Sequence, residues 1–172
     1  IDLKKDSKII AVFSAPLTIH NEKKRSLTDI ILEQGKNAEN GIKPSLDIVK
    51  SSYQKILEMV NSENQEDCKN VINSHLILSQ NALDEAYENK EFANEVRSRA
   101  LAFSGEILIS HVMNYILRSN SIITDAVKFE DWPIITDNNI ESTNFLSSES
   151  REKMQKIAEL VDKNEVVTIG GF

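Results

Sequence analysis

The 172-residue sequence predicts an α/β protein with a mainly parallel sheet and helices on both faces of that sheet. Two observations predict this class. Short apolar segments rich in β-branched residues stand near both ends of the chain, at Lys8–Phe13 and Glu165–Ile169. Longer segments between them carry apolar residues at helical spacing. We therefore expect a three-layer αβα sandwich, with residues 1–172 forming part of a larger domain.

The first predicted strand is Lys8–Phe13, which Pro16 ends. Its apolar residues run on without alternation, as in a central strand that is buried on both faces. A polar loop follows, and its basic run Lys23–Arg25 is interpreted as a solvated tip. Ser26 can then cap a short helix, which Gly35 is expected to terminate after Gln34.

Three further helices are predicted in the middle of the chain. Ser45 can cap the first, and the third spans about residues 91 to 117. The apolar faces are Leu46, Val49, Tyr53, Ile56, Leu57 and Val60, then Val71, Ile72, His75, Leu76, Ala82, Leu83 and Ala86, then Leu101, Phe103, Ile107, Leu108, Val112, Tyr115 and Ile116. Gly105 lies inside the third helix, where glycine costs roughly 1 kcal/mol relative to alanine. We expect a kink or a close approach there.

The last third of the chain returns to the sheet. Asn120 can adopt the left-handed conformation that ends the third helix, and Ser121–Ala126 reads as a second core strand. Trp132–Asp137 is a candidate for a short edge strand, because its proline cannot donate a ladder hydrogen bond. Ser148 can cap a final helix before Glu165–Ile169 forms the last strand.

The composition limits the classes of function. A net charge of −7 and a pI of about 5.1 disfavour nucleic acid and anionic membrane surfaces as partners. Cys68 is the only cysteine, which excludes an intrachain disulfide and fits a cytoplasmic protein. The sequence shows no continuous apolar run of the ~18 residues that a membrane span needs, so we expect no membrane association.

Four features could carry chemistry, each with a plainer alternative. Ser14 follows the first strand, where it can simply belong to a turn. Thr28 lies at a helix start, where a hydroxyl and free N–H groups can hold an anion or merely cap the helix. Glu106 stands in an apolar helical run, so it needs a cation unless it turns to water. The last feature is a pair of glycines after a core strand, Gly170 and Gly171, followed by Phe172.

The other chemistry-bearing residue types show no recognisable constellation. His75 and His111 fall on or beside apolar helix faces, where histidine is more often a core residue than a ligand, and His20 lies in the polar loop. No histidine pair has metal-ligand spacing, and no nucleophile, base and acid set is indicated. We therefore predict no metal site within the chain, and its catalytic residues stay unknown.

Taken in order, these features resemble the aspartate kinases of the amino-acid kinase family, which share the carbamate kinase-like sandwich. The similar segments are Lys8–Pro16, Leu27–Ile31, Phe103–Glu106 with Ser110, Asp125–Ala126, Thr136–Asn139 and Val167–Phe172. The first three match family motifs: a strand that ends in Ser-Ala, a helix that starts with Thr-Asp-Leu-Leu, and a Gly-Glu pair. The last three match the short family motifs Asp-Ala-Arg, Thr-Asp and Val-Thr-x-Gly-Phe. No single segment is specific, but the ordered series spans nearly the whole chain.

The resemblance implies ATP-dependent phosphorylation of the β-carboxylate of L-aspartate, with Mg²⁺, in lysine, threonine and methionine biosynthesis. On this reading Thr28 contacts a substrate carboxylate and Glu106 contacts the substrate ammonium. Ser14 and the backbone of Gly170, Gly171 and Phe172 line the same site. A cytoplasmic homo-oligomer is expected for the whole enzyme.

The sequence also departs from the family pattern. The opening Lys-Phe-Gly-Gly motif and the nucleotide-binding half are absent, and Val127 replaces the arginine of Asp-Ala-Arg. We therefore interpret residues 1–172 as the N-terminal, substrate-binding part of the catalytic domain, expected to be inactive alone because ATP and Mg²⁺ would bind mainly elsewhere. Two alternatives stay open: a family member that phosphorylates glutamate or a nucleoside monophosphate, and a non-catalytic α/β interaction module.

Overall fold

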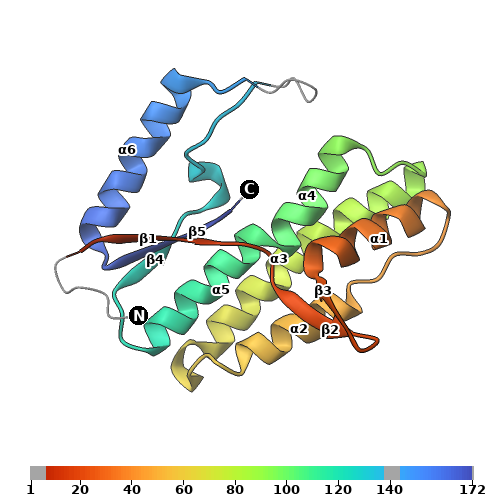
Figure 1. Ribbon diagram of the computed structural model, residues 1–172, viewed down its shortest axis with the longest axis horizontal. Coiled ribbons are helices and arrows are strands. Elements are labelled where there is room, and N and C mark those ends of the chain that lie inside the picture. Colours follow the sequence, from red (N-terminus) through yellow and green to blue (C-terminus); the bar gives the residue numbers. More distant parts are fainter. Residues whose placement is uncertain (1–6, 138–143, 172) are drawn as a thin grey trace.

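The computed structural model describes residues 7–137 and 144–171, which form a mixed α/β structure with a small parallel sheet (Figure 1). The sheet has three strands in the order β1 (Ile9–Phe13), β5 (Val166–Gly170) and β4 (Thr124–Ala126). Ile9 and Thr124 both lie opposite Val166, and both pairings are parallel. The α/β class expected from the sequence is confirmed.

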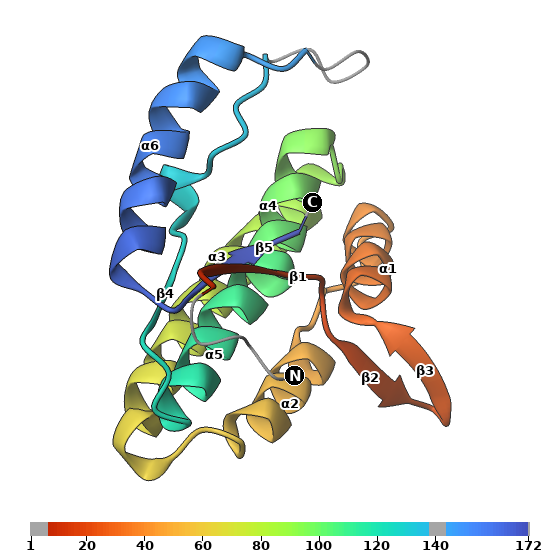
Figure 2. The same cartoon turned by 60° about the vertical axis from the view of Figure 1, so that its left-hand side comes forward.

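Strand β5 is the central strand, and its side chains alternate between two packed layers. Val167 and Ile169 join a small apolar cluster with Ile157 of α6 (Ser147–Lys163). On the opposite face, the Thr168 hydroxyl donates a hydrogen bond of 2.8 Å to the carbonyl of Ser110 in α5 (Glu106–Ser119). Helices therefore cover both faces of this strand, with α6 on one side and α5 on the other (Figure 2).

The expectation that the first strand is central and doubly buried is wrong. Among the described residues β1 is an edge strand, and Ile10 and Val12 are 48% and 65% exposed. Its other face is covered, since Phe13 packs on the helical core. A continuous apolar run predicts that both faces of the strand are covered. On the α6 side of the sheet, however, the apolar cluster includes side chains of β5 and neither Ile10 nor Val12 of β1.

Five helices form the larger body of the protein. They are α1 (Leu27–Glu39), α2 (Asp47–Leu57), α3 (Ser62–Asn89), α4 (Asn94–Ser104) and α5. Their apolar faces meet in one core, as the helical spacing predicts. The expected end of α1 at Gly35 is wrong, because the helix continues to Glu39. Gly35 instead allows close packing: a Cβ there would lie 2.1 Å from the Phe92 ring.

The segment between β1 and α1 is a hairpin rather than a polar loop. Strand β2 (Leu17–His20) pairs antiparallel with β3 (Lys23–Ser26), so the expected loop tip at Lys23–Arg25 is wrong. The two turn residues, Asn21 and Glu22, have φ of 51° and 62°. A two-residue turn with both φ positive matches the twist of paired strands, but glutamate in the second position is not its usual signal.

Three boundaries near the end of the chain also differ from expectation. The left-handed residue after α5 is Ser121, with φ of 61°, and not Asn120. The second core strand is limited to the three residues of β4. Within the described residues, Trp132–Asp137 forms no strand and contributes one isolated bridge from Thr136 to Phe145. A 3₁₀ turn, η1 (Phe129–Asp131), precedes it.

Helices α4 and α5 together give one apolar helical segment, Asn94–Ser119, of 26 residues. By length and composition alone this segment is able to cross a membrane, since its mean hydropathy reaches 1.3. However, 61% of that apolar window is buried inside the protein, as in a core helix. The expectation of no membrane association stays a prediction.

Candidate functional site

Three of the predicted site residues meet where β1 and β5 end. The Gly171 N–H donates a 2.7 Å hydrogen bond to the Phe13 carbonyl, which ties the two strand ends together. A Cβ on Gly170 would lie 2.7 Å from the backbone oxygen of Glu106, closer than any side chain tolerates. Glycine at this position is therefore required for α5 to begin directly against the sheet. Ser14 follows Phe13 at the same edge and is exposed.

The start of α1 lies beside this edge through the chain that leaves β1. A Cβ on Gly105 would be 3.4 Å from the Cβ of Ala15, and the carbonyl of Pro16 accepts a 2.9 Å hydrogen bond from the Leu27 N–H. The β2–β3 hairpin thus brings the start of α1 back beside Pro16, close to the end of β1. Thr28, the second residue of α1, is half-buried at the helix start.

Ser26 performs the capping role that was the plainer alternative for this segment. Its hydroxyl accepts a 3.0 Å hydrogen bond from the Asp29 N–H. The hydroxyl of Thr28 makes no hydrogen bond to any residue within 7–137 or 144–171. Thr28 is therefore the side chain of this helix start that can still bind a ligand.

Glu106 is the first residue of α5 and is half-buried. Within the described part of the chain its carboxylate has no ion-pair partner inside 4.0 Å. The close approach expected at Gly105 is confirmed, because a Cβ there would meet the Leu101 carbonyl at 2.8 Å. The single helix expected over about residues 91 to 117 is wrong, because it is divided at Gly105 into α4 and α5. The result is a partly desolvated negative charge that the described residues leave unneutralised.

Tyr53 of α2 contacts the backbone at the break between α4 and α5. Its side chain is fully buried, and its hydroxyl donates to the carbonyls of Ser104 at 2.9 Å and Gly105 at 3.2 Å. Burial, and then the negative charge of Glu106, raise the pKa of Tyr53 well above its usual value. The hydroxyl therefore stays protonated and donates at the break, where the Gly105 carbonyl also accepts a 2.9 Å hydrogen bond from the Ile109 N–H of α5.

From the sequence, Tyr53 is predicted only as one residue of an apolar helix face. The available signal was its hydroxyl, because a buried tyrosine needs a hydrogen-bond partner. The position of that partner, some fifty residues further along the chain, could not be read from the local pattern.

The remaining segments of the ordered series contribute less to this edge. The hydroxyl of Ser110 is used within its own helix, donating to the Ile107 carbonyl at 2.7 Å. Asp125 lies 3.6 Å from Arg118, an ion pair at the β4 side of the sheet. Thr136 and Asp137 follow η1, while Asn138, Asn139 and the predicted site residue Phe172 lie outside the described residues.

His75 and His111 are half-buried neighbours on α3 and α5. The rings of His75 and His111 are 5.1 Å apart. Burial lowers the pKa of His75, and burial followed by the neighbouring His75 lowers the pKa of His111 to about 4. His20, expected in a loop, is in β2.

The described residues contain no group of three or more histidine, cysteine, aspartate or glutamate side chains able to hold a metal ion. What the edge offers is the carboxylate of Glu106, the hydroxyls of Ser14 and Thr28, which make no hydrogen bond to a described residue, and backbone N–H groups at the starts of α1 and α5. Such a set suits recognition of a small molecule with a cationic and an anionic group. The chain matches no protein-family model, and a search among curated proteins finds no significantly similar sequence.

Proposed function

We propose that this chain is the substrate-binding, N-terminal part of the catalytic domain of an aspartate kinase, with the αβα architecture of the amino-acid kinase family. The whole enzyme would transfer a phosphoryl group from ATP to the β-carboxylate of L-aspartate. One observation carries the proposal. The unneutralised carboxylate of Glu106 starts a helix directly against Gly170, at the edge where β1 and β5 end.

The proposed roles follow from the charges of the substrate. Glu106 would pair with the aspartate ammonium, which removes the cost of leaving a partly buried carboxylate alone. Thr28 would donate to a substrate carboxylate, and a hydrogen bond to a charged group contributes about 1.5 to 3 kcal/mol. Ser14 and the Gly171 backbone would line the same edge. In phosphoryl transfer, such positioning and charge pairing are most of what the protein supplies.

The nucleotide is assigned to a different part of the enzyme. The residues described here include no cluster of metal ligands. The resemblance on which the proposal rests implies that ATP and Mg²⁺ bind mainly to parts of the enzyme outside residues 1–172. Within the chain, the contribution we propose is to bind and orient the amino-acid acceptor.

Calorimetric titration of L-aspartate into the complete enzyme tests the assignment. Glu106→Gln keeps the shape and removes the charge, so aspartate affinity should fall by about a hundredfold or more, in line with the loss of a charged pair. Thr28→Val should weaken aspartate by roughly tenfold to a hundredfold. Glu159→Gln, on the exposed surface of α6, is the matched control and should change nothing.

Each contrary outcome points to a named alternative. Tight binding of glutamate or a nucleoside monophosphate in place of aspartate would redirect the acceptor assignment within the same family. Equal aspartate affinity in the wild type and the Glu106→Gln variant would show that Glu106 does not form part of an aspartate site. Failure to bind any of these acceptors would favour the non-catalytic interaction module.

A further inference from the structure

Two histidine rings lie side by side where α3 packs against α5. His75 of α3 and His111 of α5 have ring centres 5.1 Å apart, with an angle of 49° between the ring planes. Both side chains are half-buried and therefore keep some contact with solvent. The two residues are distant in sequence, so the sequence alone predicts no metal site from them. The packing of the two helices brings them together.

The hydrogen bonds of this histidine pair leave ring nitrogens available. The Nδ1 atom of His75 lies 2.9 Å from the Val71 carbonyl, which can only accept, so Nδ1 carries the proton. The Nε2 atom of the neutral ring then has a free lone pair. Within residues 7–137 and 144–171, neither ring nitrogen of His111 makes a hydrogen bond. Each ring therefore offers one nitrogen that can donate an electron pair.

Both rings of the pair are neutral near pH 7. Burial lowers the pKa of His75, and burial followed by the neighbouring His75 lowers the pKa of His111 to about 4. A metal ion binds the neutral form of imidazole. A metal-binding histidine usually donates its other ring N–H to a carbonyl or carboxylate, which fixes the ring, and His75 already makes such a bond with Val71.

The separation of the rings suits one tetrahedral ion bound between them. Zinc binds imidazole nitrogen at about 2.0 to 2.1 Å, which in tetrahedral geometry places the centres of two bound rings roughly 5 Å apart. The 5.1 Å between His75 and His111 meets this requirement. Two rings that merely pack on each other also adopt this distance. The experiment below therefore counts the nitrogen ligands directly.

The carboxylates near His111 favour a cation as the ligand. Burial and His75 lower the pKa of His111, whereas the negative charges of Asp125 and Glu130 raise it. The positive charge of Lys128 has a smaller, opposite effect. Among the described residues, the carboxylate of Glu130 has no ion-pair partner inside 4.0 Å. This negative charge is therefore left to attract an ion.

Aromatic contacts place Glu130 beside the histidine pair. The ring of Phe129, the preceding residue in η1, lies 5.5 Å from the ring of Phe103. The Phe103 ring in turn lies 6.0 Å from that of His75. The segment that carries Glu130 is thus packed against the same cluster of rings.

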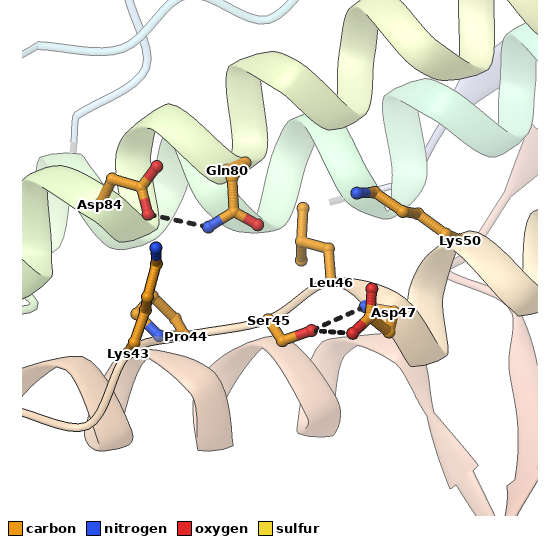
Figure 3. A pocket seen from close by; sticks show the side chains of 8 residues that line it. All are labelled: Lys43, Pro44, Ser45, Leu46, Asp47, Lys50, Gln80 and Asp84. Carbon is orange, nitrogen blue, oxygen red and sulfur yellow. Dashed lines mark hydrogen bonds between the residues drawn. The ribbon is translucent and has the colours of Figure 1, made fainter.

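A hollow at the start of α2 provides a contrast. Its volume is about 460 Å³, and its lining includes Lys43, Lys50, Asp47 and Asp84 (Figure 3). The two lysines are balanced by two carboxylates, and both carboxylates already accept hydrogen bonds. The apolar residue of the lining, Leu46, is buried. This hollow therefore presents no group that calls for a ligand, whereas the histidine pair does.

We propose that His75 and His111 form a binding site for a zinc ion between α3 and α5. The Nε2 atom of His75 and one ring nitrogen of His111 would be the protein ligands. The described residues include no group of three or more metal-binding side chains, so water would complete the tetrahedron. The ion would join α3 to α5, the helix that begins with Glu106, and would take no part in recognising aspartate.

Calorimetric titration of zinc chloride into the whole chain measures the binding. We expect one saturable site per chain. X-ray absorption at the zinc edge of the loaded protein should show two imidazole ligands at about 2.0 to 2.1 Å. Calcium should not compete, because it prefers oxygen ligands.

Matched variants separate this pair from other imidazoles. His75→Gln and His111→Gln should each weaken zinc by roughly tenfold or more and reduce the imidazole count from two to one. His20→Gln, in the β2–β3 hairpin, is the control and should change neither quantity. Circular dichroism shows whether each variant is folded. If a variant fails to fold, the imidazole count of the wild type still decides.

The proposal is overturned if zinc does not bind or if the wild type shows fewer than two imidazole ligands. It is also overturned if His20→Gln weakens zinc as much as His75→Gln does. Displacement of zinc by calcium would overturn it as well, and would identify a carboxylate site instead. All of these outcomes are independent of aspartate binding.

Discussion

The two faces of the sheet are covered to very different depths. On the α5 face, a continuous core extends through α3 and α1 and includes Tyr53 and Leu83, both fully buried. On the α6 face, the buried cluster is limited to Val127, Ile157, Val167 and Ile169. The candidate site is built on the deeply packed face, where the elements that position Glu106 have least freedom to move. The thin layer contributes none of the site residues that the structure describes.

Truncating one core residue on each face gives the largest expected contrast. Leu83→Ala should destabilise the protein by about 4 kcal/mol, because its cavity lies within a dense core that cannot collapse around it. Ile157→Ala should cost about 2 kcal/mol, since the thinner α6 layer can settle onto the sheet. Urea unfolding followed by circular dichroism gives both values. Equal protection of α6 and α3 in native-state hydrogen exchange would contradict the claim that the α6 layer is the more weakly packed one.

Acidification should weaken the deeply packed face through His111. Its pKa of about 4 in the folded state is below the usual 6.5, so the unfolded chain binds the extra proton first. Stability from this group is complete above pH 6.5 and is lost as the pH falls toward 4, by up to about 3 kcal/mol. Unfolding free energies at pH 7 and pH 4.5 measure the loss. His111→Gln should flatten this dependence, whereas His20→Gln, in the hairpin, should leave it intact.

Adding one methyl group at the strand end tests how closely the site is packed. Gly170→Ala should cost about 2 kcal/mol, because its Cβ meets the backbone of Glu106. Gly171→Ala should cost less, since its nearest neighbour is a methyl group of the exposed Val12 at 3.0 Å. Thermal melting of both variants ranks them. Equal melting temperatures would mean that α5 does not rest on β5 as tightly as described.

The smallest expected effect is that of Tyr53→Phe, which removes the hydroxyl that donates to the carbonyls of Ser104 and Gly105, although the Gly105 carbonyl keeps the Ile109 N–H as a donor. We expect a loss of about 1 to 2 kcal/mol. Aspartate binding to the complete enzyme should also weaken, because Glu106 follows directly. Tyr87→Phe, on an exposed tyrosine, is the control. Unchanged stability of Tyr53→Phe would show that the hydroxyl is not needed to hold the break.

The sequence predicts the helical body well because each helix carries its own periodic face. An irregularity at Gly105 is also predictable, since an interior glycine is costly in a helix, but the sequence predicts one kinked helix where the structure has two. The predictions that are wrong concern residues whose structure depends on partners far away in the sequence. The sequence predicts a helix end at Gly35 because nothing local shows that Phe92, in the distant loop between α3 and α4, packs on it. The edge position of β1 could not be predicted, because an apolar run does not say which of its faces a later helix will cover.

In the candidate site, too, residues marked by a local pattern are predictable from the sequence, and residues defined by distant partners are not. Glu106, Gly170 and Gly171 were singled out from local patterns, and the structure brings them together at one edge. Thr28 and Ser14 lie beside that edge as expected. Tyr53 was missed because its role is defined by two carbonyls on a different helix. The hairpin was missed because Asn21 and Glu22 give a weaker turn signal than a pair with glycine.

The pairing of β1 with β5 has a consequence for the order of folding. Phe13 lies opposite Gly170, so this contact joins residues at nearly opposite ends of the chain, whereas α3, α4 and α5 pack on near neighbours in sequence. Contacts between distant residues close late, because the loop entropy must be lost before the contact forms. The helical body is therefore expected to assemble during synthesis, while the edge that carries Glu106 and Gly170 is completed only when β5 has left the ribosome.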